Sequence, residues 1–572
     1  MDHAAPALKK SSSDKTIPAS SKTNNTPERA TEGAEPAGSG KEMKNTTYYL
    51  KSNVMAEPLV DGWYAWAHLI PPATAARNLT ERHLRIMESY IESPETHAAA
   101  VKNPAMLGGP FMDFDRNRVE DVKRLRNRTL CERSHLVNLS RAIEALDGLL
   151  REKAAGYSLE SLYSEVPACL QGYVELVYDL NNHPSFRLIE PLLYKSPFYD
   201  TSLQSMMLSE ISADDRPFVL STPRLDTDDS VQLKMPFASE PLDALFQMKT
   251  VPSSIEAIRG TLGLNGEDTE RFRSFLTTEK PRPYGKYEGD GARWRYFGHA
   301  CILLETRGVS VLLDPVLSYT YESDISRYTY DDLPEVIDYA LITHNHQDHI
   351  LFETLLQLRH RIRNIVVPRN GGGALQDPSL KLLLKQCGFA NVIELSEMEE
   401  IPFDRGSITA VPFLGEHGDL NVLTKSAYLL RVDRHTLLFA ADSCNIAPKM
   451  YEHIHREIGD VDAFFVGMEC DGAPVSWIYG PLFTQRLERP KDQSRRLAGS
   501  NYARALAMVN QFRCKEVYVY AMGQEPWLNH VMSIKYTEKS NPIIHSNHLM
   551  ETCRARSIIA ERLFGEKEIL LA

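Results

Sequence analysis

Several features that would place the chain in a class at once are missing. Its eight cysteines are spread without a C-x-x-C pair, so neither a disulfide framework nor a zinc ribbon is predicted. No stretch approaches the roughly 18 consecutive apolar residues of a transmembrane helix, and the first residues lack the apolar core of a signal peptide. We therefore expect a cytoplasmic protein with no membrane partner.

Positive charge is in short supply. The sequence holds 64 Lys and Arg against 76 Asp and Glu, a net charge of -12, whereas a nucleic-acid binder needs clustered cations to meet phosphates. The basic clusters at 123–128 and 359–363 are typical of solvated surfaces. We expect no nucleic-acid partner.

Fingerprints of organic cofactors are missing too. The glycine run RNGGGALQD at 369–377 lacks the G-x-G-x-x-G order of a dinucleotide-binding turn and is predicted to be a loop. The sequence shows no flavin or haem fingerprint either. If the protein carries out redox chemistry, its electrons must come from outside the chain.

The sequence divides into three parts. Residues 1–45 are rich in Ser, Thr, Pro, Ala and Lys, too polar to bury a core, so we expect a disordered leader. Residues 46–285 are expected to form an α-rich N-terminal domain with some strand, because 78–93, 136–156 and 158–182 carry helical signals. A charged, turn-rich passage near 280–292 marks the boundary to the third part, 290–572.

The third part is predicted to be a sandwich of two sheets. The runs WRYFGHACILLET (294–306) and GVSVLLDP (308–315) are expected to pair as a hairpin that turns at Arg307-Gly308. Further short strands follow, with helical stretches such as 350–361 and 499–512 among them. Strands interleaved with helices over about 280 residues indicate an αββα sandwich, in which helices cover both sheets.

The densest candidate site is LITHNHQDHI, residues 341–350. It has the form H-x-H-x-D-H and places His344, His346, Asp348 and His349 directly after an apolar strand. Alternation along a strand points His344 and His346 the same way, and the following loop carries the other two toward a neighbouring position. One short motif can thus supply ligands to two metal ions. The motif resembles the signature of the metallo-β-lactamase superfamily, whose members have the αββα sandwich.

Further ligands must come from later in the chain. Asp442 follows the apolar strand of LLFAADSCN and is the candidate for a carboxylate that bridges two metals. The last histidine is sought among His453, His455, His530, His545 and His548. We favour His530, because it lies in the loop after KEVYVYAM, at the end of the sheet where the other ligands gather.

One position decides the chemistry. The segment LGEHGDL (414–420) places Glu416 beside His417, and both cannot easily face the metals from one extended segment. If His417 binds, the site is that of a binuclear zinc hydrolase with a metal-activated water. If Glu416 binds, the hard carboxylate favours iron.

A second resemblance favours iron. The spacings from His344 to Glu416 (416 − 344 = 72) and to Asp442 (442 − 344 = 98), together with the passages at 48–76 and 97–113, are similar to those of the diiron β-hydroxylase family of chloramphenicol biosynthesis. The resemblance runs from about residue 47 to the end of the chain. That family hydroxylates the β-carbon of an amino acid held as a thioester on a carrier domain of a nonribosomal peptide synthetase.

The resemblance implies a ligand set and partners. His344, His346 and Glu416 would bind one iron, Asp348, His349 and His530 the other, and Asp442 would bridge them, with Glu416 and Asp442 as catalytic residues. His417 would lie outside the ligands. Two irons can reduce O2 to an oxidant strong enough for a C–H bond, whereas zinc has no redox chemistry. An aminoacyl-loaded peptidyl carrier domain and an electron-donating reductase are the implied partners.

Glu469, in FFVGMECDGAP, is expected by the same resemblance near the substrate side chain, although an ordinary turn carboxylate would fit the pattern as well. Two other functions stay open at this point. One is a binuclear zinc metallohydrolase. The other is a scaffold that has lost turnover, against which the intact ligand set argues.

Overall fold

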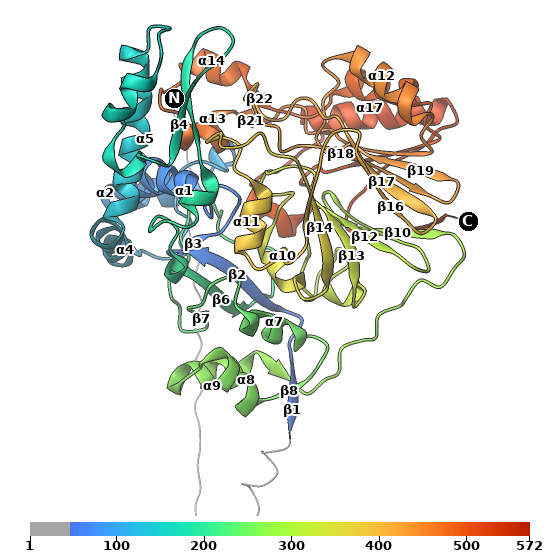
Figure 1. The fold of residues 1–572 in the computed structure, drawn as a ribbon. Helices are drawn as coiled ribbons and strands as arrows, with labels where there is room; N and C mark the ends of the chain where they lie inside the picture. Colours follow the sequence, from blue (N-terminus) through green and yellow to red (C-terminus); the bar gives the residue numbers. More distant parts are fainter. Residues whose placement is uncertain (1–45, 572) are drawn as a thin grey trace, which may run out of the picture. The chain divides into compact units, whose positions relative to one another are not determined.

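The computed structural model describes residues 46–571, and the predicted leader, 1–45, lies outside this range. Two seven-stranded sheets face each other (Figure 1), with the strand orders β15-β14-β13-β12-β11-β10-β25 and β16-β17-β18-β19-β20-β23-β24. The first sheet contains β10 (Ala292–Gly298), β11 (Cys301–Glu305), β12 (Ser310–Leu313), β13 (Ile337–Leu341), β14 (Ile362–Pro368), β15 (Val392–Leu395) and β25 (Lys567–Leu571). The second contains β16 (Glu400–Phe403), β17 (Gly406–Val411), β18 (Ala427–Val432), β19 (His435–Phe439), β20 (Ala463–Gly467), β23 (Glu516–Tyr520) and β24 (Ile559–Arg562).

Both sheets contain parallel as well as antiparallel strand pairs, and this arrangement brings the carboxyl ends of several strands to the same edge. In the first sheet, β10 to β12 are antiparallel neighbours and β12 to β15 are parallel. In the second, β16 to β19 are antiparallel, and β19, β20, β23 and β24 are parallel. The carboxyl ends of β10, β12, β13, β17, β19, β20 and β23 therefore lie at matching edges, where ligand-binding loops of α/β sheets gather.

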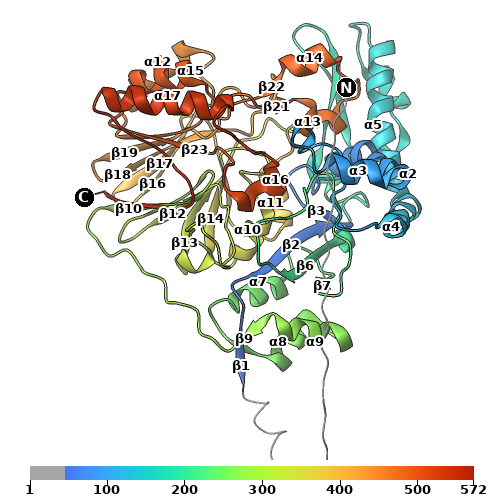
Figure 2. The ribbon, with the colours of Figure 1, turned by 180° about the vertical axis from the view of Figure 1, so that it is seen from behind.

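An apolar core lies between the sheets, and helices cover their outer faces. Trp294 of β10 meets Phe465 and Tyr518 of the other sheet edge-on, at 5.2 and 4.9 Å between ring centroids. The helices of this part are α10 (Phe352–Leu358), α11 (Leu380–Gln386), α12 (Pro448–Ile458), α13 (Ser476–Tyr479), α14 (Arg489–Ser494), α15 (Tyr502–Phe512), α16 (Asn529–Met532) and α17 (Asn541–Ala555). Figure 2 shows α12, α15 and α17 over the second sheet. The predicted αββα sandwich is confirmed.

The predicted hairpin that turns at Arg307-Gly308 is confirmed between β11 and β12, but its first arm contains a second turn that was not predicted. The run 294–306 is not one strand, because the chain reverses at His299 and Ala300 and splits into β10 and β11, with Gly298 paired to Cys301. His299 adopts a left-handed backbone, φ 52, as tight hairpin turns demand. The turn is hidden in the sequence because apolar residues stand on both sides of it.

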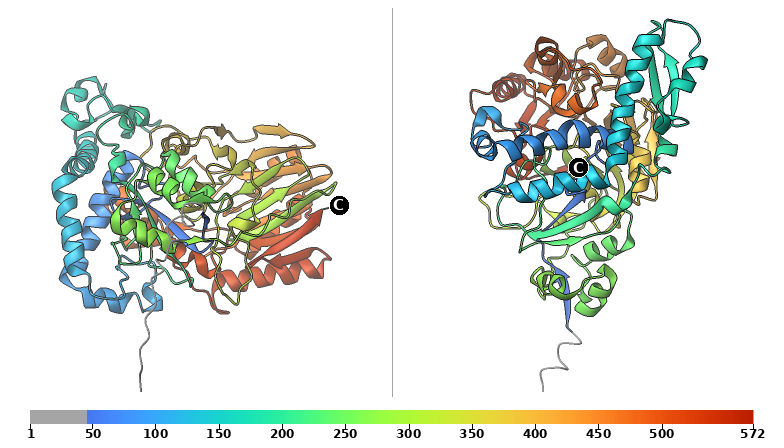
Figure 3. Two further views of the ribbon diagram at one scale, coloured as in Figure 1. Left: turned by 90° about the horizontal axis from the view of Figure 1, so that it is seen from below. Right: turned by 90° about the vertical axis from the view of Figure 1, so that its left-hand side faces the viewer.

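Residues 47–277 form a mixed α/β part that packs against the sandwich (Figure 3). Its strands are β1 (Thr47–Leu50), β2 (Val54–Val60), β3 (Trp63–Tyr64), β4 (Val174–Tyr178), β5 (Pro184–Leu188), β6 (Gln204–Glu210), β7 (Val231–Leu233), β8 (Ser253–Ser254) and β9 (Leu276–Thr277). Its helices are α1 (Pro72–Asn78), α2 (Leu84–Glu92), α3 (Pro94–Ala100), α4 (Val119–Glu132), α5 (Ser134–Lys153), α6 (Glu190–Leu193), α7 (Glu240–Gln247), α8 (Ile255–Leu262) and α9 (Gly266–Ser274). Among residues 46–571, no helix combines the length and apolar character that a membrane crossing needs.

The helical predictions hold in part. The run 136–156 contains α5, and 78–93 contains α2, although the helix already begins at Pro72 and passes through a wider turn at Leu79–His83. The run 158–182 was expected to be helical and is not: it holds short 3-10 turns and then strand β4. Its Tyr and Val residues favour a pleated, half-buried strand.

A buried ion cluster joins the N-terminal part to the metal-motif end of the sandwich. Glu57 of β2 accepts hydrogen bonds from Arg224 at 2.8 to 3.0 Å and from Arg216 at 2.6 Å. Arg216 also donates to Glu353 of α10 at 2.8 Å, and Tyr64 donates to the same carboxylate at 2.7 Å. Burial alone would raise the pKa of Glu57, but the two guanidinium groups lower it to about 2.

We predict that Arg216→Met destabilises the protein, because it leaves Glu353 and part of Glu57 buried without a cation. The free energy of unfolding at neutral pH should fall by about 3 to 5 kcal/mol, the usual effect of breaking a buried ion pair. Ionised Glu57 stabilises the fold above its ordinary pKa of 4.5, and this contribution is lost as the pH falls toward 2. The variant should therefore lose stability less steeply than wild type between these pH values.

Denaturant unfolding at several pH values would measure both effects. Lys449→Met is the matched control, because Lys449 pairs with Glu452 on the surface, where an ion pair contributes little. Equal stabilities of wild type and Arg216→Met would contradict the role given to the cluster.

Candidate metal centre

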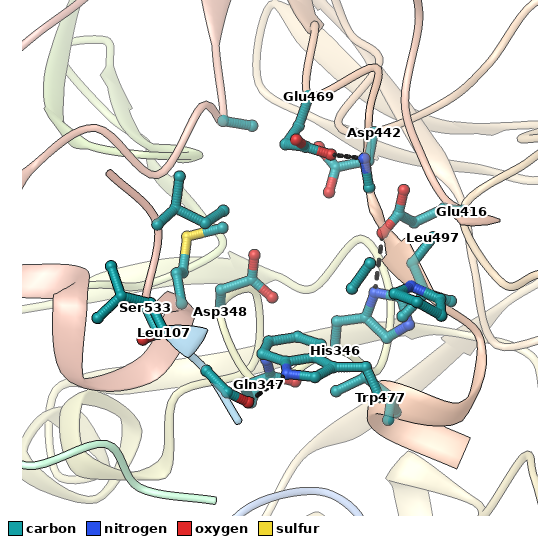
Figure 4. Close-up of a pocket in the computed structure, with 18 residues that line it drawn as sticks. Leu107, His346, Gln347, Asp348, Glu416, Asp442, Glu469, Trp477, Leu497 and Ser533 are labelled. Carbon is teal, nitrogen blue, oxygen red and sulfur yellow. Dashed lines mark hydrogen bonds and ion pairs between the residues drawn. The ribbon is translucent and has the colours of Figure 1, made fainter. Parts of the chain in front are cut away.

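Loops at the carboxyl ends of several strands bring their polar side chains to one cavity (Figure 4). The cavity has a volume of about 300 Å³, and its lining includes His346, Asp348, Glu416, Asp442 and Glu469. These residues come from the loops after β13, β17, β19 and β20. Residues nearly 125 positions apart (469 − 346 = 123) thus share one small space.

The H-x-H-x-D-H loop is held from behind by a carboxylate. Asp314, fully buried at the end of β12, accepts hydrogen bonds from the backbone N and the Oγ1 of Thr343, both at 2.7 Å. It also lies 2.8 Å from His349 Nδ1, and Thr343 Oγ1 lies 3.0 Å from His344 Nδ1. These contacts turn the Nε2 atoms of His344 and His349 inward, which is how carboxylates behind metal-binding histidines orient them. Sequence reasoning missed Asp314, although LLDP places it at a strand end.

A first group unites His344, His346 and Glu416, whose candidate ligand atoms all lie within 4.8 Å of one another. His346 Nδ1 is 3.3 Å from Glu416 Oε1, and its Nε2 is 3.2 Å from the Tyr479 hydroxyl. Glu416 has a left-handed backbone, φ 67, a strained conformation for this residue type. This backbone conformation directs the Glu416 carboxylate toward His344 and His346.

His417 takes a different place. Its ring packs against that of His346 at 4.6 Å, and its Nδ1 lies 3.3 Å from the carbonyl oxygen of Gly415. Among the described residues, it belongs to no group of side chains that could hold a metal. Of the two neighbours, the geometry therefore brings Glu416, and not His417, to the histidine pair.

A second group unites His299, Asp348 and His349. His299 Nε2 lies 3.1 Å from Asp348 Oδ2 and 3.3 Å from His349 Nε2. The backbone N of Gly523 donates to His299 Nδ1 at 3.2 Å, which leaves Nε2 free for the group. Sequence reasoning missed His299, because the turn that carries it was read as the middle of a strand.

The structure places His530 apart from the other candidate ligands, so its role as a ligand stays a prediction. This residue lies on the short helix α16 and faces Tyr64, at 6.1 Å between ring centroids, and Glu353, whose Oε2 is 3.9 Å from His530 Nε2. It is absent from the groups that the described residues form. The loop after β23 does approach the centre, but through Ala521 and Gly523, and it then leads His530 away into the ion cluster.

Asp442 lies between the two groups. Its Oδ2 is 3.0 Å from His349 Nε2 and 3.8 Å from His344 Nε2. Gly467 at the end of β20 makes room for it, because a Cβ there would lie 2.5 Å from Asp442 Oδ1. This position between the two groups is the one expected of a bridging carboxylate.

The charges and unpaired atoms fit metal cations. Burial, together with Asp442 and Asp348, raises the pKa of Glu416 well above its usual value. Burial lowers the pKa of His344 well below its usual value and that of His346 to about 4, so both rings offer lone pairs. His344 Nε2 and Asp442 Oδ1 are buried without a hydrogen-bond partner. Cations among these residues would satisfy the unpaired atoms and balance the crowded carboxylates.

Glu469 lies on the upper side of the cavity in Figure 4, near Asp442. The backbone N of Gly472 donates to its Oε2 at 2.5 Å, and the Tyr536 hydroxyl lies 3.4 Å from its Oε1. Burial raises the pKa of Glu469 to about 7. The structure thus places this carboxylate in the wall of the cavity, outside the groups of candidate ligands.

Comparisons with known proteins agree with this architecture. Residues 49–281 match the family model of the diiron non-heme beta-hydroxylase N-terminal domain, and residues 310–473 match that of the beta-lactamase superfamily domain. A protein of the UPF0173 family from Pyrococcus abyssi is 30% identical over 122 residues, 21% of this chain and 48% of that protein.

One relative is similar over nearly the whole chain. The 4-amino-L-phenylalanyl-[CmlP-peptidyl-carrier-protein] 3-hydroxylase of Streptomyces venezuelae is 41% identical over 533 residues, 92% of this chain and 100% of the relative. The crystal structure of CmlA, a diiron beta-hydroxylase from Streptomyces venezuelae, superposes with a TM-score of 0.86 at 39% identity, over 92% of this chain and 99% of that one. The chain therefore belongs to the family of diiron non-heme β-hydroxylases, and it is an enzyme with a beta-lactamase-fold domain and a dinuclear iron cofactor.

Proposed function

We propose that this enzyme hydroxylates the β-carbon of an amino acid bound as a thioester to a peptidyl carrier domain of a nonribosomal peptide synthetase. The observation that carries the proposal is Glu416 beside His344 and His346, because a carboxylate at this position suits iron better than zinc. The relative that acts on an aminoacyl carrier protein supports the substrate class. The alternative of a zinc hydrolase needed His417 as a ligand, and His417 lies behind His346.

Seven side chains are proposed to hold the two irons. His344, His346 and Glu416 would bind one, His299, Asp348 and His349 the other, and Asp442 would bridge them. The pair would supply the activation of O2 that an unactivated C–H bond requires. Thr343 and Asp314 would keep the histidine rings oriented, and Tyr479 would hold His346 through its hydroxyl.

Glu469 is proposed to contact the substrate. Its carboxylate is fixed by Gly472 and Tyr536 and lines the same cavity as Glu416 and Asp442. A buried carboxylate in a cavity wall binds a hydrogen-bond donor strongly, because it has little water to give up. We therefore propose that it selects an amino acid with a donor group.

A carrier domain and a separate reductase are the proposed partners. The reductase would supply two electrons, since the sequence carries no fingerprint of an organic redox cofactor. The free state of all eight cysteines supports the proposed cytoplasmic location, where thiols stay reduced.

The proposal is tested by incubating the iron-loaded enzyme, a chemical or enzymatic reductant and O2 with carrier domains that bear different amino acids. We predict that one loaded carrier gains the mass of a single oxygen atom. The free amino acid should react far more slowly, because docking of the carrier positions the β-carbon. Comparable turnover of the free amino acid would refute the tethered substrate.

We predict that Glu416→His gives a folded protein with less iron and more zinc, and hydroxylase activity lowered about tenfold or more, the scale of a disturbed metal site. His417→Ala should be much milder, because this ring packs against His346 and lies outside the groups of candidate ligands. Metal analysis and circular dichroism would check both. If His417→Ala abolished metal binding while Glu416→His were tolerated, the zinc hydrolase interpretation would be favoured instead.

We predict that His299→Ala lowers the iron content toward one ion per chain, because the second group would keep only Asp348 and His349. His530→Ala is the matched control and should keep two ions, although it removes an imidazole of the same size from an equally buried position. The number of iron ions per folded chain, measured for both variants, shows which histidine binds iron. Loss of iron in His530→Ala with full content in His299→Ala would return the ligand role to His530.

A further inference from the structure

Two cavities meet at one tryptophan. The inner one is the cavity over the proposed iron ligands, of about 300 Å³. A second hollow, the outer groove, of about 590 Å³, opens between α2, residues 108–111, residues 218–221 and α13. The two share three lining residues, Gly108, Pro474 and Trp477.

Trp477 and Gly108 form the partition between the two spaces. Trp477 Nε1 donates a hydrogen bond of 2.9 Å to the carbonyl oxygen of Gly108, and its ring lies nearly parallel to Phe218, at 6.0 Å between centroids. In Figure 4, Trp477 and Leu107 lie on the side of the cavity opposite Glu469. A single neutral hydrogen bond contributes little net stability, so a ligand can displace this contact.

The partition is anchored on both sides, which confines its opening to a small movement. Arg82 donates to the carbonyl oxygens of Trp477 and Ile478, at 2.5 and 3.2 Å. On the other side, Ser221 donates to the carbonyl oxygen of Phe111 at 2.7 Å. These contacts hold the backbone at Trp477 and at Phe111, so opening the partition would require movement of the indole away from Gly108.

The outer groove has the lining of a binding site for a slender chain. Phe111, Phe218 and Trp477 form an aromatic wall, and Pro110 stands exposed at the rim. At the surface end, Arg85 is half exposed and pairs with Glu81. The groove thus combines an apolar strip with two arginines, Arg82 and Arg85, against one carboxylate, Glu81, which suits a flexible, mostly uncharged molecule that carries an anion at one end.

Two other hollows among residues 46–571 lack this connection. A groove around Arg282 and Arg361 and another around Phe186 and Phe483 share no lining residue with the inner cavity. Continuity with the metal cavity therefore singles out the outer groove.

We propose that the outer groove binds the phosphopantetheine arm of the carrier domain, and that Trp477 with Gly108 is a door through which its thioester end reaches the iron ligands. The inference rests on the proposed function, which requires such an arm. The uncharged amide chain would lie along Phe111 and Phe218, and the phosphate would lie near Arg85. Trp477 is then a positioning residue that closes the cavity to water when no arm is bound.

Binding of 4′-phosphopantetheine to the full-length, iron-loaded enzyme tests the groove by calorimetry. We expect measurable binding that Pro110→Trp weakens at least tenfold, because the new ring fills the groove. Ser185→Trp, which adds the same bulk at the exposed rim of the groove around Phe186, should bind as wild type does. Absent binding to wild type, or equal binding to Pro110→Trp, would overturn the groove assignment.

The proposed door is tested by measuring how fast a soluble chelator removes iron from the enzyme. We expect Trp477→Ala to release iron at least fivefold faster than wild type at equal initial iron content. Trp477→Phe keeps an aromatic ring but loses the hydrogen bond to Gly108, and it should fall between the two. Identical release from all three proteins would refute the door.

The two proposals fail in different ways. If Pro110→Trp hydroxylates a carrier-bound amino acid with wild-type kinetics, the groove assignment is wrong, while the proposed function is supported. If phosphopantetheine binds in the groove while no carrier-bound amino acid gains oxygen, the groove assignment is supported, while the proposed function is wrong.

Discussion

Carboxylates crowded away from water are the constraint on which this site depends. Asp348, Glu416, Asp442 and Glu469 line one cavity, and each would repel the others at a separation of a few ångströms in a medium of low polarity. Among the described residues that line the cavity, none is Lys or Arg. The fold thus gathers more negative charge than the histidines around the cavity can balance, and bound cations would supply the rest.

The surrounding structure accepts unfavourable backbone conformations to keep these groups in place. His299, Glu416 and Ala441, which precedes Asp442, all have positive φ angles. Such conformations persist only where the packing around them is strong. Here the packing comes from the apolar core between the sheets, where Trp294, Phe465 and Tyr518 are almost fully buried. The rigid core therefore tolerates strained backbone conformations at the edge of the sheets, and these conformations direct the candidate ligands toward the cavity.

Sequence reasoning succeeded where the signal is local. The H-x-H-x-D-H motif lies within six residues after one strand, and Asp442 follows another apolar strand, so both were found from short patterns, and the structure brings them together. It failed where the signal is distant. His299 contacts residues 49 and 50 positions away, and no local pattern marks the turn that carries it. His530 was chosen from its place after a strand, and no local pattern shows that the loop carries it to the side of Glu353 and Tyr64. The strand at 174–178 was missed because its apolar spacing also suits a helix.

The pairing of β10 with β25 has a consequence for the order in which the protein is made. β25, residues 567–571, pairs with β10 in register from Ala292 opposite Leu571 to Tyr296 opposite Lys567. Until residues 567–571 leave the ribosome, β10 is paired with β11 alone and its other edge is open, and β10 leads into the turn that carries His299. The H-x-H-x-D-H loop leaves the ribosome more than 200 residues earlier (567 − 349 = 218). In a nascent chain, the sheet edge beside the His299 turn would therefore stay open while residues 350–567 are made, and we expect the proposed metal site to reach its final geometry only after β25 has paired with β10.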